Sequence, residues 1–534
     1  MIIDELGNEF LPEGYALGNW MVQESFLFGT GSFSADFKPF MRAEGMDRTR
    51  SIHQILIETC GRSYAEAYWD RFYENYVQEE DIRLMAEQGF NTLRIPLNGR
   101  MFLEDEPEIC FIEKRFEILD RIIAWCDKYG IYAVIDMHAA TAGQSGVSCD
   151  DGVDNMPHLF LDEAERERTI RLWEKLAERY KDEACVAGYE LLNEPIALPF
   201  FDFLIPELLS FYDECIDRIR KIDRKHIIFL QGNRFASRWD MFRKNMDPQN
   251  NWVLTIHIYE LLPDLGLFGP ILQARDELDV PVWIGETGGS TNWTTVCFEM
   301  LRQYHIGYNV WVYKAVDRND APTMVFYNVP EDLKEISAYA LQGKQKPSYE
   351  KARRIFDQYL ECIRYENCIL HDDVVKAIRR TRGSVIPAIG YDVTPDSFHG
   401  NYPYCHFCGY RREDHLEFVL PSGVRPYEAP GFAKIAAEKV PKYGEFNRLM
   451  LKLKENEYVS YTFRNIDKPA QLKITAYTSH GNISTSTHDH TETFTLDHTG
   501  ETVLSCMMLP ECEKITCRIT CTSGTVVLKN IFTE

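Results

Sequence analysis

Short apolar stretches alternate with amphipathic segments along the first three fifths of the chain. In the segments between them, apolar residues recur at helical spacing, as in Arg115 to Gly130, where the glycine supplies the stop. Eight strand–helix units in about 300 residues predict a (β/α)8 barrel. A doubly wound open sheet is the alternative, but no Gly-rich phosphate turn follows the first strand. The expected strands are Gly14 to Trp20, Thr92 to Pro96, Tyr132 to His138, Val186 to Pro195, His226 to Gly232, Trp252 to Tyr259, Val282 to Thr287 and Tyr308 to Lys314.

The pattern changes after the barrel. Residues 346–444 read as two helices and an irregular connector that pack on a barrel spanning residues 1–345. Residues 445–534 contain short alternating stretches separated by turns, such as "EYVSYTFRNI" and "TVVLKNIFTE", and predict a smaller all-β sandwich that resembles a jelly roll. The Ser/Thr/His-rich stretch His480 to Thr493 is expected to be a solvated loop between two strands.

Charge and length narrow the possible partners. The chain has 534 residues, 45% of them apolar, which is enough for a large core and one further module. Its formal net charge of −24 disfavours nucleic acid and anionic membranes as partners. We find neither an export signal at the amino terminus nor about 18 consecutive apolar residues that would span a membrane.

The fifteen cysteines show no disulfide framework, because their number is odd and several fall within apolar patterns. Free thiols in a reducing cytoplasm fit this distribution, and the expected location is cytoplasmic. The pair Cys405 and Cys408 has the spacing of a zinc knuckle but lacks a matching second pair, so packed thiols are expected there as well.

Polar side chains end one predicted strand after another. Because the carboxyl ends of barrel strands meet at one mouth, these side chains are expected to converge. Two of them, Glu194 and Glu286, end the fourth and seventh strands on opposite sides of that mouth. Cleavage of a glycosidic bond needs such a pair, since one carboxylic acid protonates the departing oxygen while the other carboxylate attacks the anomeric carbon. The full set is Arg94, His138, Asn193, Glu194, His257, Tyr259, Glu286 and Trp311.

The motifs around these residues resemble family 5 glycoside hydrolases, the cellulase-like group of clan A. They are "LRIP", "DMH", "NEP", "HIY" and "GETG", in this order, followed by a Trp on the eighth strand. The resemblance covers about the first 320 residues. It implies that Glu194 is the general acid and base and that Glu286 is the nucleophile.

The resemblance also implies roles for the neighbours of the two glutamates. Arg94 would hold Glu286 ionised, Tyr259 would donate to the same carboxylate, and His257 would lie near Glu194. The remaining members would contact sugar: Asn193 at the 2-hydroxyl, and His138 and Trp311 along the subsite of the sugar that is cleaved.

Other polar residues are expected to be structural. Glu190, in the same strand as Glu194, is interpreted as a salt-bridged residue, and Asp136 as a hydrogen-bond acceptor behind the site. In the stretch after the third strand, Gln144 matches a "GQNG" type of loop that exo-acting relatives often show, but Ser145 does not.

The sequence therefore predicts a retaining β-glycoside hydrolase that acts on β-glucosides or β-glucan oligosaccharides, without cofactor or metal. The long loops Ala139 to Phe160 and Met21 to Phe40 favour a pocket and exo action. Two alternatives stay open: an endo-β-glucanase or mannanase of the same family, and a catalytically silent carbohydrate-binding barrel. A metal-dependent hydrolase would need paired His ligands, whereas the sixth strand offers only His257 with Tyr259.

Overall fold

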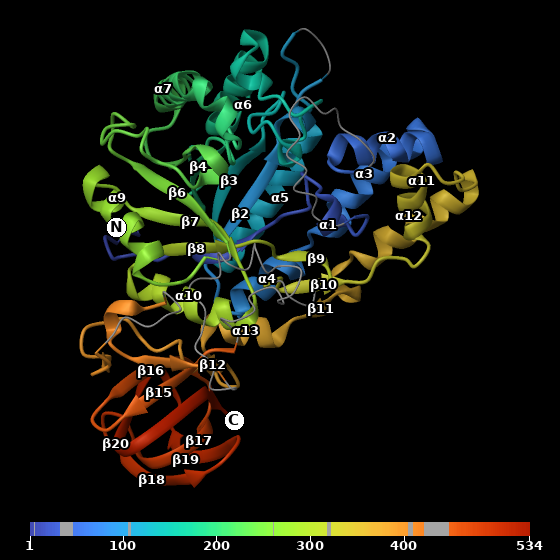
Figure 1. The fold of residues 1–534 in the computed structure, drawn as a ribbon. Coiled ribbons are helices and arrows are strands. Elements are labelled where there is room, and N and C mark those ends of the chain that lie inside the picture. Colours follow the sequence, from blue (N-terminus) through green and yellow to red (C-terminus); the bar gives the residue numbers. More distant parts are fainter. Residues whose placement is uncertain are drawn as a thin grey trace.

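Eight parallel strands close into a barrel, as the sequence predicts. The computed structural model describes residues 1–4, 6–31, 46–104, 108–259, 261–317, 322–403, 410–420 and 448–534. The barrel strands pair in sequence order, and β1 closes the ring by pairing with β8 (Figure 1). They are β1 (Glu13–Ala16), β2 (Thr92–Asn98), β3 (Tyr132–Ala139), β4 (Val186–Glu190), β5 (Ile227–Gln231), β6 (Trp252–Tyr259), β7 (Val282–Gly288) and β8 (Gly307–Val310).

Helices fill the crossovers between the strands and cover the outside of the barrel. The helix predicted over Arg115 to Gly130 is α5, and it stops at Gly130, whose positive φ of 69° suits a residue without a side chain. The helices are α1 (Ser25–Phe28), α2 (Thr49–Cys60), α3 (Arg62–Tyr76), α4 (Glu79–Glu87), α5 (Glu113–Tyr129), α6 (Glu163–Tyr180), α7 (Ile205–Ile222), α8 (Asn233–Ala236), α9 (Leu265–Leu278) and α10 (Thr291–Gln303). No helix in the described parts of the chain is long and apolar enough to cross a membrane.

Three predicted strands extend at least four residues beyond the carboxyl ends of the observed ones. The fourth was expected to continue to Pro195, yet β4 ends at Glu190, and Glu194 has a positive φ of 43°, in the left-handed region and outside the β region. The first ends at Ala16. The eighth is interrupted at Trp311, and Lys314–Val316 forms a separate strand, β9, in a small sheet with β10 (Val325–Tyr327) and β11 (Ile369–Leu370).

Helices after the barrel pack on its outside. The chain forms α11 (Leu333–Gln342), α12 (Tyr349–Cys362) and α13 (Asp372–Arg379). The first of these packs against α12, which itself packs against α2 and α3, and α13 packs against α10. Figure 1 shows α2, α3, α11 and α12 gathered on one side of the barrel.

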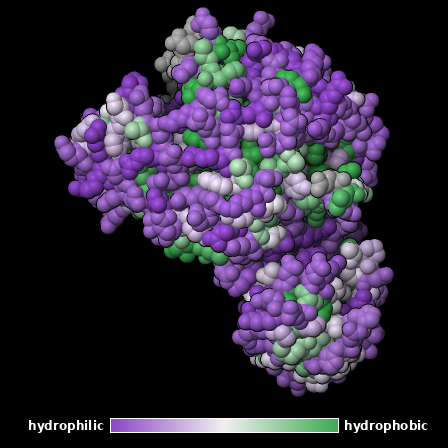
Figure 2. Space-filling model, turned by 180° about the vertical axis from the view of Figure 1, so that it is seen from behind, coloured by the Kyte–Doolittle hydropathy of each residue, from purple (hydrophilic) through white to green (hydrophobic). Residues whose placement is uncertain are grey.

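A separate antiparallel β-domain follows, consistent with the predicted sandwich. Figures 1 and 2 show it as a lobe beside the barrel, and the rear face in Figure 2 is predominantly hydrophilic on both lobes. The two longest strands, β17 and β20, pair with each other over much of their length. The domain consists of β12 (Val385–Pro387), β13 (Phe398–His399), β14 (Glu417–Val419), β15 (Met450–Lys454), β16 (Tyr458–Ile466), β17 (Ala470–Ser486), β18 (Thr491–His498), β19 (Thr502–Leu509) and β20 (Cys512–Thr533).

The β-domain differs from the expectation in two ways. The loop predicted over His480 to Thr493 is wrong, since β17 continues to Ser486 and pairs with β18 and β20. Its Ser and Thr residues suggest a loop by polarity, but they also suit an outward-facing strand. In addition, β12, β13 and β14 come from the segment expected to be a connector, because strands of two or three residues are too short to show a period. Cys405 and Cys408 lie outside the described residues, and the described cysteines are free.

Candidate active site

The structure brings all eight predicted side chains to the carboxyl ends of the barrel strands. They come from β2, β3, β6 and β7 and from the segments that follow β4 and β8. Because the strands are parallel and in register, residues distant in sequence become neighbours; His257 on β6, for example, is paired with Glu286 on β7.

Glu286 lies at the end of β7 and is 5% exposed. The Arg94 guanidinium donates from Nη1 to Glu286 Oε1 at 2.6 Å, and the Tyr259 hydroxyl donates to Oε2 at 2.9 Å. Both oxygens of this carboxylate therefore accept strong donors that offset its negative charge and fix its orientation.

Glu194 has a different environment. Its Oε1 lies 2.8 Å from His257 Nδ1, and its Oε2 lies 3.9 Å from the thiol sulfur of Cys149. Neither partner carries a fixed positive charge. Burial raises the pKa of Glu194 to about 7. Burial also lowers the pKa of His257 to about 4, so its imidazole is neutral near pH 7.

Arg94 connects the site to the interior of the barrel. It is fully buried and contacts three carboxylates: Glu286, Glu190 at 2.5 Å from its Nε, and Asp136 at 3.0 Å from its Nη2. The salt bridge expected of Glu190 is therefore present. The Nη2 atom also donates to Asn193 Oδ1 at 2.8 Å, which orients that amide beside the two glutamates. Burial opposes the charge on Arg94, but the carboxylates around it raise its pKa above the ordinary value.

His138 and Trp311 form a flat wall of the site. Their rings stack with 5.1 Å between centroids and an angle of 3° between planes. Asp136 Oδ2 lies 2.9 Å from His138 Nδ1, as expected of an acceptor behind the site, and Asn193 Nδ2 lies 3.3 Å from His138 Nε2. Burial lowers the pKa of His138 to about 4, so the ring is neutral. A stacked aromatic wall beside polar groups suits the apolar face and hydroxyl edge of a sugar.

The loop after β3 closes tightly on the site. Gln144 is fully buried, accepts from the Ala140 N–H with Oε1, and donates from Nε2 to the carbonyls of His138 and Asn193 at 2.8 and 2.7 Å. This amide holds the loop against the end of β4. Asp151 in the same loop accepts from Arg100, which fixes the loop's far side.

Two residues at the site were not predicted. Cys149 contacts Glu194 from the same loop, and Gln231, the last residue of β5, accepts from the Glu194 backbone N–H at 2.7 Å. Gln231 follows the same rule as the predicted residues, a polar side chain at a strand end, and that signal could have identified it. Nothing in the sequence around Cys149 indicates its contact.

Three side chains at the site carry atoms of the kinds that bind metal ions. Among the described residues, one group has potential ligand atoms that all lie within 4.8 Å of one another, namely Glu194, His257 and Glu286. Arg94 and Tyr259 already donate hydrogen bonds to Glu286, so a cation would compete with them for that carboxylate.

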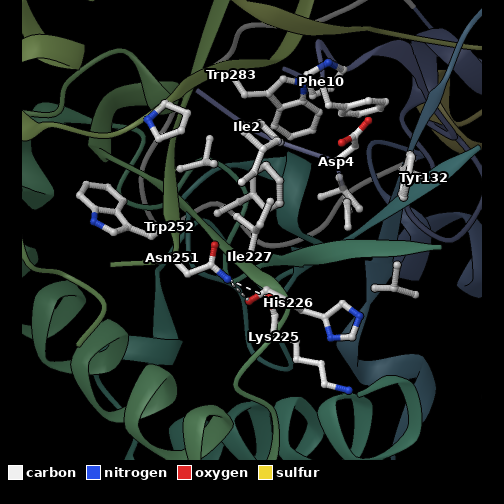
Figure 3. A pocket seen from close by; sticks show the side chains of 18 of the residues that line it. Ile2, Asp4, Phe10, Tyr132, Lys225, His226, Ile227, Asn251, Trp252 and Trp283 are labelled. Carbon is white, nitrogen blue, oxygen red and sulfur yellow. Dashed lines mark hydrogen bonds between the residues drawn. The ribbon is translucent and has the colours of Figure 1, made fainter. Parts of the chain in front are cut away.

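A cavity of about 510 Å³ opens at the opposite end of the barrel from the candidate site (Figure 3). It is lined mainly by apolar side chains, including Phe10 and Trp283, with Ile2 from the amino-terminal segment packed inside. His226 and Asn251, which line its polar side, directly precede β5 and β6. The cavity therefore lies at the amino ends of the strands, the face of a barrel that serves stability, and it contains neither glutamate of the site.

Comparison with known proteins identifies the barrel. A family model described as cellulase (glycosyl hydrolase family 5) matches residues 52–317. A β-xylosidase of Phanerodontia chrysosporium is 33% identical over 260 residues, which are 49% of this chain and 50% of that protein. A probable glucan 1,3-β-glucosidase A of Neosartorya fischeri is 28% identical over 253 residues, which are 44% of this chain and 57% of that protein.

A solved structure of a rutinosidase from Aspergillus niger is 17% identical, covers 57% of this chain and 90% of its own, and superposes with a TM-score of 0.45. The architecture rests on the strand order described above and not on this likeness. The chain spans about half the length of the curated relatives it matches. The family match extends from α2 to the end of the barrel and includes every one of the eight strand-end residues, and through this barrel the chain belongs to glycosyl hydrolase family 5.

Proposed function

We propose that this protein hydrolyses β-glycosidic bonds with retention of configuration, with Glu286 as the nucleophile and Glu194 as the general acid and base. The observation that carries the proposal is the spacing of the two carboxyl groups. One carboxyl oxygen of Glu194 lies within 4.8 Å of a carboxyl oxygen of Glu286. Retaining enzymes hold their carboxyl groups about 5 to 5.5 Å apart, whereas inverting enzymes leave about 6.5 to 9.5 Å for a water molecule.

The two environments divide the chemistry between the glutamates. In the first step, the Glu194 carboxylic acid gives its proton to the glycosidic oxygen, the bond from that oxygen to the anomeric carbon breaks, and a Glu286 oxygen bonds to the same carbon. In the second step, Glu194 takes a proton from water, the water oxygen bonds to the anomeric carbon, and Glu286 leaves as a carboxylate. A pKa of about 7 suits Glu194 for both transfers.

Two features support β-glucosides or short β-glucan oligosaccharides as substrates and release of terminal sugars. Two of the matched relatives are named as a β-xylosidase and a probable glucan 1,3-β-glucosidase A. The loop after β3 is held down by Gln144 and Asp151, so it walls one side of the site. The second loop expected to form this wall, Met21 to Phe40, lies partly outside the described residues.

The proposal is tested with aryl β-glucosides and aryl β-xylosides. The product should carry the β configuration when NMR first detects it, and Glu286→Gln should lower kcat by at least about a thousandfold without unfolding the protein. An initial α-anomer would rule out retention, and an inactive wild-type protein that still binds oligosaccharides would support the silent barrel. Rapid viscosity loss of a soluble β-glucan before any monosaccharide appears would show an endo-acting enzyme.

A further inference from the structure

The side chain of Gln231 lies directly beneath Glu194. Its Oε1 accepts from the Glu194 backbone N–H at 2.7 Å, and its Nε2 donates to Glu190 Oε1, also at 2.7 Å. Gln231 and Glu190 are both fully buried. The amide orientation follows from its partners, because an N–H needs an oxygen and a carboxylate needs a donor. At neutral pH, neither a carboxylate nor an apolar side chain could satisfy both groups.

The other oxygen of Glu190 is connected to the proposed nucleophile, Glu286, through Arg94. Glu190 Oε2 accepts from Arg94 Nε at 2.5 Å, and the same guanidinium donates from Nη1 to Glu286. A continuous series of hydrogen bonds therefore runs from the Glu194 backbone through Gln231, Glu190 and Arg94 to the Glu286 carboxylate.

The backbone at Glu194 explains why such support is needed. Its φ of 43° lies in the left-handed region, which a residue with a side chain seldom adopts unless its surroundings hold it there. The bond from its N–H to Gln231 is one such constraint, since a rotated peptide would leave that N–H without this acceptor.

The residue before the nucleophile leaves room for this arrangement. A Cβ atom on Gly285 would lie 2.5 Å from Thr255 Cγ2 and 3.3 Å from Glu190 Oε1. A larger residue would therefore press on the buried carboxylate at the centre of the series.

We propose that Gln231 and Glu190 are positioning residues that link the two catalytic glutamates, so that Glu194 keeps its left-handed backbone and its distance from Glu286. The inference rests on the proposed function. Neither residue touches the substrate; Gln231 acts through Glu194, and Glu190 acts through Gln231 and Arg94.

Gln231→Met tests the link, because methionine has nearly the shape of glutamine but neither donates nor accepts strongly. We expect kcat/KM to fall about 100-fold for a disaccharide, whose leaving group needs a proton, and less than about threefold for a dinitrophenyl glycoside, which needs none. With the dinitrophenyl substrate, azide should raise kcat, because it attacks the glycosyl-enzyme without a base and forms the glycosyl azide.

Two further variants separate positioning from a general structural role. Gln231→Glu, when protonated, can accept from Glu194 and donate to Glu190, so its disaccharide activity should return at low pH and disappear as the pH rises. Tyr212→Phe is the matched control, because the Tyr212 hydroxyl donates to the Gln231 backbone carbonyl at 2.7 Å and not to its amide. Tyr212→Phe should change kcat/KM by the same factor for the disaccharide and for the dinitrophenyl glycoside.

A crystal structure of Gln231→Met makes the outcome independent of activity. We expect Glu194 to leave its left-handed conformation there. An unchanged Glu194, an equal loss on both substrates, or no effect of azide would overturn the inference. If the wild-type protein hydrolyses neither substrate, the proposed function fails, and the conformation of Glu194 in the variant still decides whether Gln231 holds it.

Discussion

The two glutamates illustrate how neighbouring atoms assign different tasks to identical side chains. Glu286 accepts from a guanidinium and a phenol, whereas the partners of the Glu194 carboxyl group among the described residues are a neutral imidazole and a thiol. The Cys149 thiol has one proton, and both Ser145 Oγ and Glu194 Oε2 lie within its reach. The ionised carboxylate is the stronger acceptor, so the thiol favours it. Burial raises the pKa of Cys149 and keeps the thiol protonated.

This contact predicts the effect of Cys149→Ala on the pH profile. Wild-type kcat/KM should fall as the pH rises through about 7, since Glu194 must be protonated to act as an acid. Removing the thiol removes a donor that stabilises the ionised form, so the alkaline limb should move up by about half a pH unit, the equivalent of a weak hydrogen bond. Cys149→Ser, which retains a donor, should stay close to wild type. A limb that moves to lower pH in the alanine variant would contradict this role.

At the scale of elements, hydrogen bonds hold two loops together beside Glu194. The segment after Glu194 forms two backbone hydrogen bonds with the β3–α6 loop, from Ile196 N to Gln144 O at 3.0 Å and from Ala197 N to Ser145 O at 2.8 Å. The next residue of that loop, Gly146, has a φ of 80°, and a Cβ there would lie 2.4 Å from the Phe201 ring. The close approach of the two loops therefore requires glycine.

Gly146→Ala should displace the loop and lower activity as well as stability. We expect the free energy of unfolding to fall by about 1 to 3 kcal/mol, from the unfavourable φ and the clash with Phe201, and kcat/KM to fall about tenfold or more. The control is Gly130→Ala at the end of α5, where φ is also positive, 69°, but no atom lies within 4 Å of the added Cβ. Calorimetry should show a stability loss for both variants, and kinetics a loss for Gly146→Ala alone. If kcat/KM were the same for Gly146→Ala and Gly130→Ala, the loop would not support the site.

At the scale of the whole molecule, an ionic contact with a buried carboxylate joins the barrel to the β-domain. Glu299 on α10 is 1% exposed and accepts from Arg464 on β16 at 2.7 Å, while Arg302 lies 3.5 Å from its other oxygen. Burial opposes the charge on Glu299, but Arg380 and the other arginines around it lower its pKa to about 2. The β-domain is thus fixed to α10, the helix that follows β7.

Glu299→Gln should destabilise the protein by about 3 kcal/mol, because it removes a buried carboxylate that offsets the charges of Arg302, Arg380 and Arg464, and should leave kcat on small aryl glycosides within about twofold. The pKa of Glu299 is lower in the folded state, so its contribution is complete above its ordinary value of about 4.5 and is lost as the pH falls toward about 2. Wild-type stability should therefore decline more steeply than that of the variant across this range.

Denaturant unfolding at several pH values measures the effect of Glu299. Asp217→Asn, which breaks an exposed pair with Lys221, is the control and should change stability by less than about 0.5 kcal/mol. Parallel pH curves for wild type and Glu299→Gln would show that the interdomain contact does not titrate in this way.

Much of the barrel and its site was determined by the sequence alone. Apolar stretches of strand length separated by helical patterns identified all eight barrel strands, because burial of a strand or helix face leaves a period along the chain itself. Eight residues at the strand ends were identified for the same reason, since a polar side chain after an apolar run is a local signal, but Gln231 at the end of β5 was missed. The all-β domain was also expected from its alternating stretches.

The tertiary structure decided what lies between segments that are distant in sequence. The bond from Glu194 to Gln231 joins residues 37 positions apart, and the contact with Cys149 spans 45. Such contacts depend on how strands and loops pack against one another, and the periodic pattern of apolar residues along the sequence contains no information on that packing. The left-handed backbone of Glu194 is likewise invisible in an apolar stretch that reads as a strand, and the polar end of β17 reads as a loop until β18 and β20 pair with it. The sequence placed the two glutamates at one mouth, and only packing set the hydrogen bonds that give their carboxyl groups different surroundings.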